Sequence, residues 1–173
     1  GSSAPDRAMT GVGFQPDFVW SKSRVGANQS NLQNSVYTLG DSLNSDATAA
    51  AGDTKSSGYL ASLDSDGFTS TAGSSGVVNW DESGRTYVAW NWKAGGAPTV
   101  DNSAGVVAVP TAGSVKIDGS NLGSALAGTI AATRLSANTT AGFSVVTYTG
   151  TGSASTIAHG LSQAPDLVWA KSI

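Results

Sequence analysis

The residues best suited to chemistry begin with an acidic segment, Asp64-Ser65-Asp66-Gly67. Two carboxylates at alternate positions before a glycine are typical of the opening of a calcium-binding loop. The same segment, flanked by Leu63 and Phe68, also has the composition of a tight β-turn, and no glutamate follows at the spacing that calcium requires. The sequence therefore favours a turn and no cofactor, with Asp64 and Asp66 as the candidate ligands if calcium binds.

A second acidic segment, Trp80-Asp81-Glu82, places an indole beside two acids, as a sugar-binding site would. Glycoside hydrolysis needs two carboxylates roughly 5–10 Å apart across a groove. Adjacent residues of a strand point to opposite faces, so Asp81 and Glu82 cannot form that pair by themselves. We therefore expect no catalytic residues, and Trp80, Asp81 and the nearby Tyr87 are candidate glycan contacts.

The composition excludes several other kinds of site. The 173 residues include no cysteine and one histidine, His159, which rules out thiol chemistry and two-histidine metal sites. His159 precedes Gly160, which indicates a bend rather than the base of a Ser-His-Asp triad. A net charge of -3 gives no basic surface for nucleic acid. No apolar run approaches the roughly 18 residues of a membrane span, so we expect no membrane insertion.

Apolar residues alternate along the chain, which predicts half-buried strands. The clearest strand is 86–93, where period two places Val88, Trp90 and Trp92 on one face. We expect that face to lie in the core, because burying two indoles removes a large apolar area from water. Further strands are expected at 17–21, 35–39, 58–62, 67–70, 129–136, 143–149 and 166–170.

Short strands separated by turn signals predict an all-β chain, namely an antiparallel β-sandwich of the jelly-roll or concanavalin-like type. Helical spacing occurs only over 120–127. We expect three parts: a main sandwich module over 1–97, a linker or crossover rich in small residues over 98–128, and the opening strands of a second module over 129–173.

An internal repeat motivates that division. The segment 13–23 recurs as 160–172, sharing the pattern Pro-Asp-φ-Val-Trp-x-Lys-Ser, which implies tandem modules of one structural unit. Trp20 and Trp169 hold equivalent positions, which favours a core or module-packing role for both. We expect the first module to lack its opening strands and 143–149 and 166–170 to complete it by strand addition, within one chain or between two.

Four phrases in order carry a family resemblance: residues 10–22, 63–69, 83–96 and 136–152. Together they resemble tandem modules in structural proteins of marine bacteriophages, of the cyanophage- and pelagiphage-like kind. The resemblance implies a lectin-like sandwich in a virion, as a noncatalytic structural and adhesion module of a tail fibre or other appendage.

The same resemblance implies a homo-oligomer, with a trimer expected, that assembles with other virion proteins and contacts host surface glycans. Two alternatives stay open on this sequence. One is a depolymerase or glycoside hydrolase on a lectin-like sandwich, and the other is a free-standing carbohydrate-binding domain.

Overall fold

The computed structural model describes residues 6–53, 55–74, 79–103 and 105–173, and over these ranges the chain is all-β, as expected. The only helical element among them is the 3₁₀ turn η1, Lys55–Ser57. None of the described helices is long and apolar enough to cross a membrane. The strands are β1 Arg7–Thr10, β2 Phe18–Ser23, β3 Asn31–Asn34, β4 Asp41–Asn44, β5 Gly52–Asp53, β6 Tyr59–Asp64, β7 Gly67–Thr71, β8 Tyr87–Trp92, β9 Val115–Ile117, β10 Ser120–Asn121, β11 Ala132–Asn138 and β12 Phe143–Tyr148.

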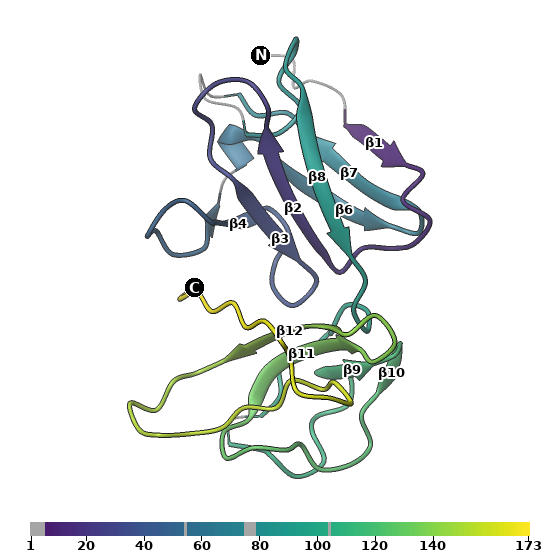
Figure 1. Cartoon of the computed structure of the whole chain (residues 1–173), viewed down its shortest axis with the longest axis vertical. Coiled ribbons are helices and arrows are strands. Elements are labelled where there is room, and N and C mark those ends of the chain that lie inside the picture. The colour runs from purple at the N-terminus through teal and green to yellow at the C-terminus, as the bar shows by residue number, and fades with distance from the viewer. Residues whose placement is uncertain (1–5, 54, 75–78, 104) are drawn as a thin grey trace. The chain divides into compact units, whose positions relative to one another are not determined.

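The chain forms two compact units. The first comprises the described residues up to Trp92 together with Trp169–Ile173, and the second is Lys93–Val168. In the first unit an antiparallel sheet, ordered β5-β4-β3-β2-β8, faces a smaller sheet ordered β1-β7-β6. Figure 1 shows β2, β3 and β8 in front of β6 and β7. The predicted antiparallel β-sandwich is therefore confirmed for this unit.

The core of the first unit lies between its two sheets. Its buried apolar residues are Val19, Leu60, Phe68 and Trp80, and Ala89 of β8 packs against them. Ala89 faces inward, so its neighbours Val88 and Trp90 must face outward. Trp90 is 46% exposed. The prediction that the Val88, Trp90 and Trp92 face lies in the core is therefore wrong.

Volume explains why the tryptophans of β8 point outward. The interior of a sandwich is about 10 Å thick, and side chains from both sheets share it. Phe68 and Trp80 fill this space from the opposite side, with ring centroids 6.0 Å apart. From the larger sheet, the small residues Val19 and Ala89 pack against these two rings.

Two other expected strands, 35–39 and 166–170, differ from the structure. Strand β3 ends at Asn34, before the expected strand 35–39. The side-chain carbonyl of Asn34 accepts a hydrogen bond from the amide of Val36 at 3.0 Å, and such a bond turns the chain instead of extending it. Residues 166–170 pair with no strand among the described residues, although their sequence repeats that of β2.

The second unit is built on one sheet, ordered β10-β9-β11-β12, in which β9 and β11 are parallel and the other pairs antiparallel. The segment 120–127, the one place where helical spacing occurs, forms no helix. Asp118-Gly119 forms a two-residue hairpin turn between β9 and β10, with φ of 51° and 85°. Asp-Gly is a strong hairpin signal, and it folds the chain back as β10. The buried core residues are Val115, Leu126, Ala132, Leu135, Ala137 and Ala158.

The boundaries of the units differ from those expected. The expected linker 98–128 contains β9 and β10, and its irregular part is bonded into the second unit: the amide of Asn102 donates to Thr133 at 2.9 Å. Strand β12 pairs with β11 from Phe143 to Tyr148, so within this chain it does not add to residues 13–97 as expected. The backbone groups of β12 form hydrogen bonds with the neighbouring strand β11. This pairing closes only a short loop, which costs less entropy than closing a long one.

Candidate functional site

An aromatic face covers the outer side of β2 and β8. The register places Phe18 opposite Trp92 and Trp20 opposite Trp90. Directly opposed residues lie on one face of a sheet with Cβ atoms about 5 Å apart, so the rings meet. The ring centroids are 5.4 Å apart in the first pair and 5.3 Å in the second. We call Phe18, Trp20, Trp90 and Trp92 the aromatic face.

A fifth ring joins this surface from the end of the chain. Trp169 packs against Trp20 with a centroid separation of 5.2 Å, and its residue is 53% exposed. Two residues on, the ammonium of Lys171 donates to the carbonyl of Ala47 at 3.0 Å. The equivalent tryptophans of the two repeat copies therefore contact each other, on the outer surface of the sheet.

Polar groups lie at one end of the aromatic face. Lys22 faces outward beside Val88, and its ammonium donates to the carbonyl of Asn28. The same ammonium is 4.0 Å from the carboxylate of Asp46. Exposed aromatic rings bordered by hydrogen-bonding groups can stack on the apolar side of a sugar ring and hold its hydroxyls.

Sequence reasoning missed this surface because it placed the β8 tryptophans in the core. A signal was available in β2, where Phe18 and Trp20 alternate with the small residues Val19 and Ser21. Those small residues are buried, with exposures of 0% and 1%. Pairing β2 with β8 in register would have aligned all four rings on the opposite face.

The predicted glycan contacts Trp80, Tyr87 and Asp81 do not form an exposed site. Trp80 is 3% exposed and belongs to the core, so no sugar can reach its ring. Tyr87 lies on the inner side of β8, and its phenolic oxygen accepts a hydrogen bond from the amide of Glu82 at 3.1 Å. Burial raises the pKa of Tyr87. The exposed aromatic surface is formed instead by Trp90 and its neighbours.

The two adjacent acids each pair with an arginine. Asp81 has a left-handed backbone, with φ of 50°, and its carboxylate is 2.9 Å from the guanidinium of Arg7. Glu82 pairs with Arg85 three residues later at 2.5 Å. Both carboxylates are therefore held in ion pairs within the loop before β8.

Asp64 and Asp66 lie at the tip of the β6–β7 hairpin, where Asp64 pairs with Gly67, so the turn is confirmed. Asp64 accepts hydrogen bonds from the hydroxyls of Ser62 and Thr69, both at 2.7 Å. Among the described residues, no three His, Cys, Asp or Glu side chains gather as a metal site would require.

The carboxylate of Asp66 holds the loop after β1. It accepts hydrogen bonds from the amides of Gly11 at 3.0 Å and Gly13 at 2.6 Å. These bonds lower the pKa of Asp66, the Gly13 amide contributing most, because they stabilise the ionised carboxylate. Asp64 and Asp66 thus accept hydrogen bonds from different groups, and each carboxylate has a structural role in holding its own loop or hairpin.

His159 makes a hydrogen bond within its own segment of the chain. Its Nδ1 accepts a hydrogen bond from the amide of Leu161 at 3.1 Å. Gly160, between them, has φ of 71°. The bends of this segment lie at Ser162 and Gln163 instead, so the bend expected at His159-Gly160 is not observed.

No curated protein and no solved structure matches the chain significantly. One family model, described as a domain of unknown function (DUF7483), matches it twice, over residues 1–117 and 116–173. The two matches meet within β9, whereas the two compact units divide after Trp92. The boundary between the matches therefore lies inside the second unit, where β9 pairs with β11. Since the matches together span the chain, it belongs to this DUF7483 family.

Proposed function

We propose that this chain is a noncatalytic structural and adhesion module that binds host surface glycans through its aromatic face. The observation that carries the proposal is the row of paired rings on β2 and β8, with Trp90 46% exposed at a distance from the core. Contiguous exposed apolar surface on a folded unit is characteristic of binding sites.

The geometry of the face favours an extended saccharide over a small apolar ligand. The rings lie on two adjacent strands at successive outward positions, which are about 7 Å apart along a strand. An oligosaccharide can place the apolar sides of successive sugar rings on such a ladder. Several weak contacts of this kind suit adhesion, because copies in an oligomer add their affinities.

The acids nearest the sequence-predicted sugar site support the noncatalytic part of the proposal. Asp81 and Glu82 are each paired with an arginine, at 2.9 Å and 2.5 Å. A glycosidase needs two carboxylates that face each other across a groove, where both can reach the scissile bond. Two arginine-paired carboxylates serve better to fix the loop before β8.

The resemblance of the sequence to marine phage appendage modules supports a place in the virion. On this proposal the chain forms a homotrimer, contacts other virion proteins and lies in a tail fibre or other appendage. Sedimentation equilibrium of the purified chain tests the oligomer, with a trimer mass expected. A strictly monomeric chain at all concentrations would count against the fibre assignment while leaving glycan binding to be judged separately.

A glycan array with the purified chain tests the binding proposal. We expect a set of oligosaccharides to bind, Trp90→Ala to weaken binding about tenfold or more, and Trp90→Phe to retain most of it. Val109→Ala is the control, because Val109 is 58% exposed and lies in the second unit. Circular dichroism confirms that each variant folds.

Two outcomes would overturn the proposal. Equal binding by Trp90→Ala and the unmodified chain would remove the aromatic face as the site. Release of reducing ends from a bound glycan would show that the chain is a glycan-cleaving enzyme and not a noncatalytic module.

A further inference from the structure

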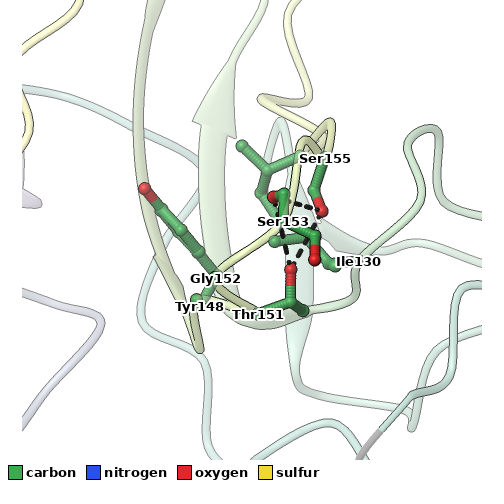
Figure 2. A pocket seen from close by; sticks show the side chains of 8 residues that line it. Ile130, Tyr148, Thr151, Gly152, Ser153 and Ser155 are labelled. Carbon is green, nitrogen blue, oxygen red and sulfur yellow. Dashed lines mark hydrogen bonds between the residues drawn. The ribbon is translucent and has the colours of Figure 1, made fainter.

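A pocket in the second unit lies beside the loop that follows β12. Its volume is about 240 Å³, and its lining residues are Ile130, Tyr148, Gly150, Thr151, Gly152, Ser153, Ser155 and Ile157. A water molecule occupies about 30 Å³ of liquid, so the pocket has room for a ligand the size of one sugar ring. Figure 2 shows the hydroxyls of Thr151 and Ser155 turned toward each other, with Tyr148 on the other side of the view.

The lining offers hydroxyls, one aromatic ring and apolar side chains, and none of its eight residues is charged. An ion placed there would lose hydration without gaining a counter-charge, which disfavours phosphates, carboxylates and amines. A neutral ligand with many hydroxyls and one apolar face can form hydrogen bonds with the hydroxyls of the lining and pack against its aromatic and apolar side chains. Neutral sugars have this character.

The hydroxyl bonds of the loop orient its oxygens. Ser155 donates its hydroxyl hydrogen to the carbonyl of Ser153 at 3.1 Å. The Thr151 hydroxyl donates to the same carbonyl at 3.5 Å and lies 3.1 Å from the Ser155 hydroxyl. Both hydroxyl hydrogens are thereby used within the loop, so the two oxygens present lone pairs to ligand O–H groups.

The floor of the pocket is held by backbone bonds. The amide of Ile130 donates to the carbonyl of Thr156 at 3.2 Å, and the amide of Thr156 donates to the Thr129 hydroxyl at 3.0 Å. Ile157 bridges the chain at Ile130 and at Gly128. These contacts fix both isoleucines before a ligand arrives, which lowers the entropy cost of binding.

We propose that this pocket is a second carbohydrate site, taking one ring of a neutral saccharide. The phenol ring of Tyr148, a residue 47% exposed, covers the apolar side of the sugar, and Thr151 and Ser155 accept from its hydroxyls. The site shares no residue with the aromatic face and does not depend on it. In a repeated adhesion module it would supply a second point of attachment.

The test is an NMR titration of the full chain with the methyl glycosides of glucose, galactose and mannose. We expect at least one to shift the amides of residues 150–157 with millimolar affinity, and glucuronic acid and glucosamine to bind at least about tenfold more weakly. Trp90→Ala leaves this binding unchanged, which separates the pocket from the aromatic face.

Two variants locate the ligand. Tyr148→Ala should weaken binding at least about fivefold. Gly150→Leu should abolish it, because Gly150 lines the pocket and an added Cβ there meets no atom within 4 Å. Gly123→Leu is the matched control, since its added Cβ also meets nothing within 4 Å and Gly123 does not line the pocket.

Three results would overturn the proposal. One is the absence of shifts in residues 150–157 with every neutral glycoside, and another is equal binding of the charged sugars. The third is a Gly150→Leu chain that binds as well as Gly123→Leu. Because Tyr148, Gly150 and Gly123 are exposed, these variants are expected to fold, and the amide spectrum shows directly whether they do.

Discussion

Residues 16–23 and 165–172 have nearly the same sequence, differing at two of eight positions, and adopt different structures. The first copy contains β2, which pairs with β3 on one side and β8 on the other. The second copy has no strand partner among the described residues. Val19 is 0% exposed and its equivalent Val168 is 76% exposed. A strand-forming sequence therefore becomes a core strand only where two neighbours complete its ladder.

The surroundings of the equivalent tryptophans, Trp20 and Trp169, differ less between the two copies than those of the equivalent valines. Trp20 lies between Trp90 and Trp169, with centroids 5.3 Å and 5.2 Å away. Trp169 reaches this surface without joining the sheet. An indole can gain contact area from one face alone, whereas the backbone of a strand needs partners for both edges or water in their place.

The largest predicted effect contrasts the two valines. Val19→Ala should lower the free energy of unfolding of the first unit by about 2 kcal/mol, because it removes buried methyl groups and leaves a cavity. Val168→Ala should change it by less than about 0.5 kcal/mol. Urea unfolding followed by tryptophan fluorescence measures both, since all five tryptophans belong to the first unit. Similar losses in the two variants would contradict the comparison.

A smaller effect concerns the residue opposite Val19 on β3. Gln33 is 0% exposed, and neither its amide nitrogen nor its amide oxygen has a protein partner. A buried polar group without a hydrogen bond costs about 1–3 kcal/mol, so Gln33→Met should raise the unfolding free energy by about 1 kcal/mol. The same urea titration detects it. A clear loss of stability would mean that the amide has hydrogen-bond partners in solution.

The contact between Trp20 and Trp169 should contribute less to the free energy of unfolding. In a double-mutant cycle, Trp20→Ala and Trp169→Ala should couple by about 0.5–1.5 kcal/mol, the usual range for an aromatic pair. Calorimetry is the suitable measurement, because the substitutions remove fluorescent residues. A cycle of Trp20→Ala with Val109→Ala, a residue of the second unit, is the control and should show no coupling. Equal coupling in both cycles would mean that Trp169 does not pack on Trp20.

The smallest effect is the acid dependence of the β1 loop. The folded-state pKa of Asp66 is lowered from 3.8 by the Gly13 and Gly11 amides, so its stabilising contribution is complete above the unfolded pKa. It is lost as the pH falls through the lower folded-state pKa. Melting temperatures below about pH 4 should therefore fall slightly more steeply for the unmodified chain than for Asp66→Asn. Parallel curves would show that these bonds do not affect stability.

Several features followed from local sequence. The alternation of apolar residues predicted strands at the sites of β6, β7, β8 and β12, and Asp66-Gly67 predicted the hairpin turn. Local patterns work in these cases because a turn or a strand's period depends on neighbouring residues.

The hairpin at Asp118-Gly119 shows where local patterns competed. Spacing of Leu122, Ala125 and Leu126 indicated a helix, while the Asp-Gly pair just before them indicated a turn. The turn prevailed, and the amide of Leu122 donates to the carbonyl of Val115 at 3.0 Å across the hairpin. The sheet of the second unit, which gives β9 a parallel partner in β11, offered more hydrogen bonds than an isolated turn of helix.

By itself, the sequence determined the all-β class, the repeat and which residues of β8 share a face. The tertiary structure decided which face is buried, because Phe68 and Trp80 from outside the larger sheet occupy the interior and pack against the small residues Val19 and Ala89. It also decided which repeat copy becomes a strand. Both outcomes depend on partners distant in the sequence, and alternation within one strand carries no information about them.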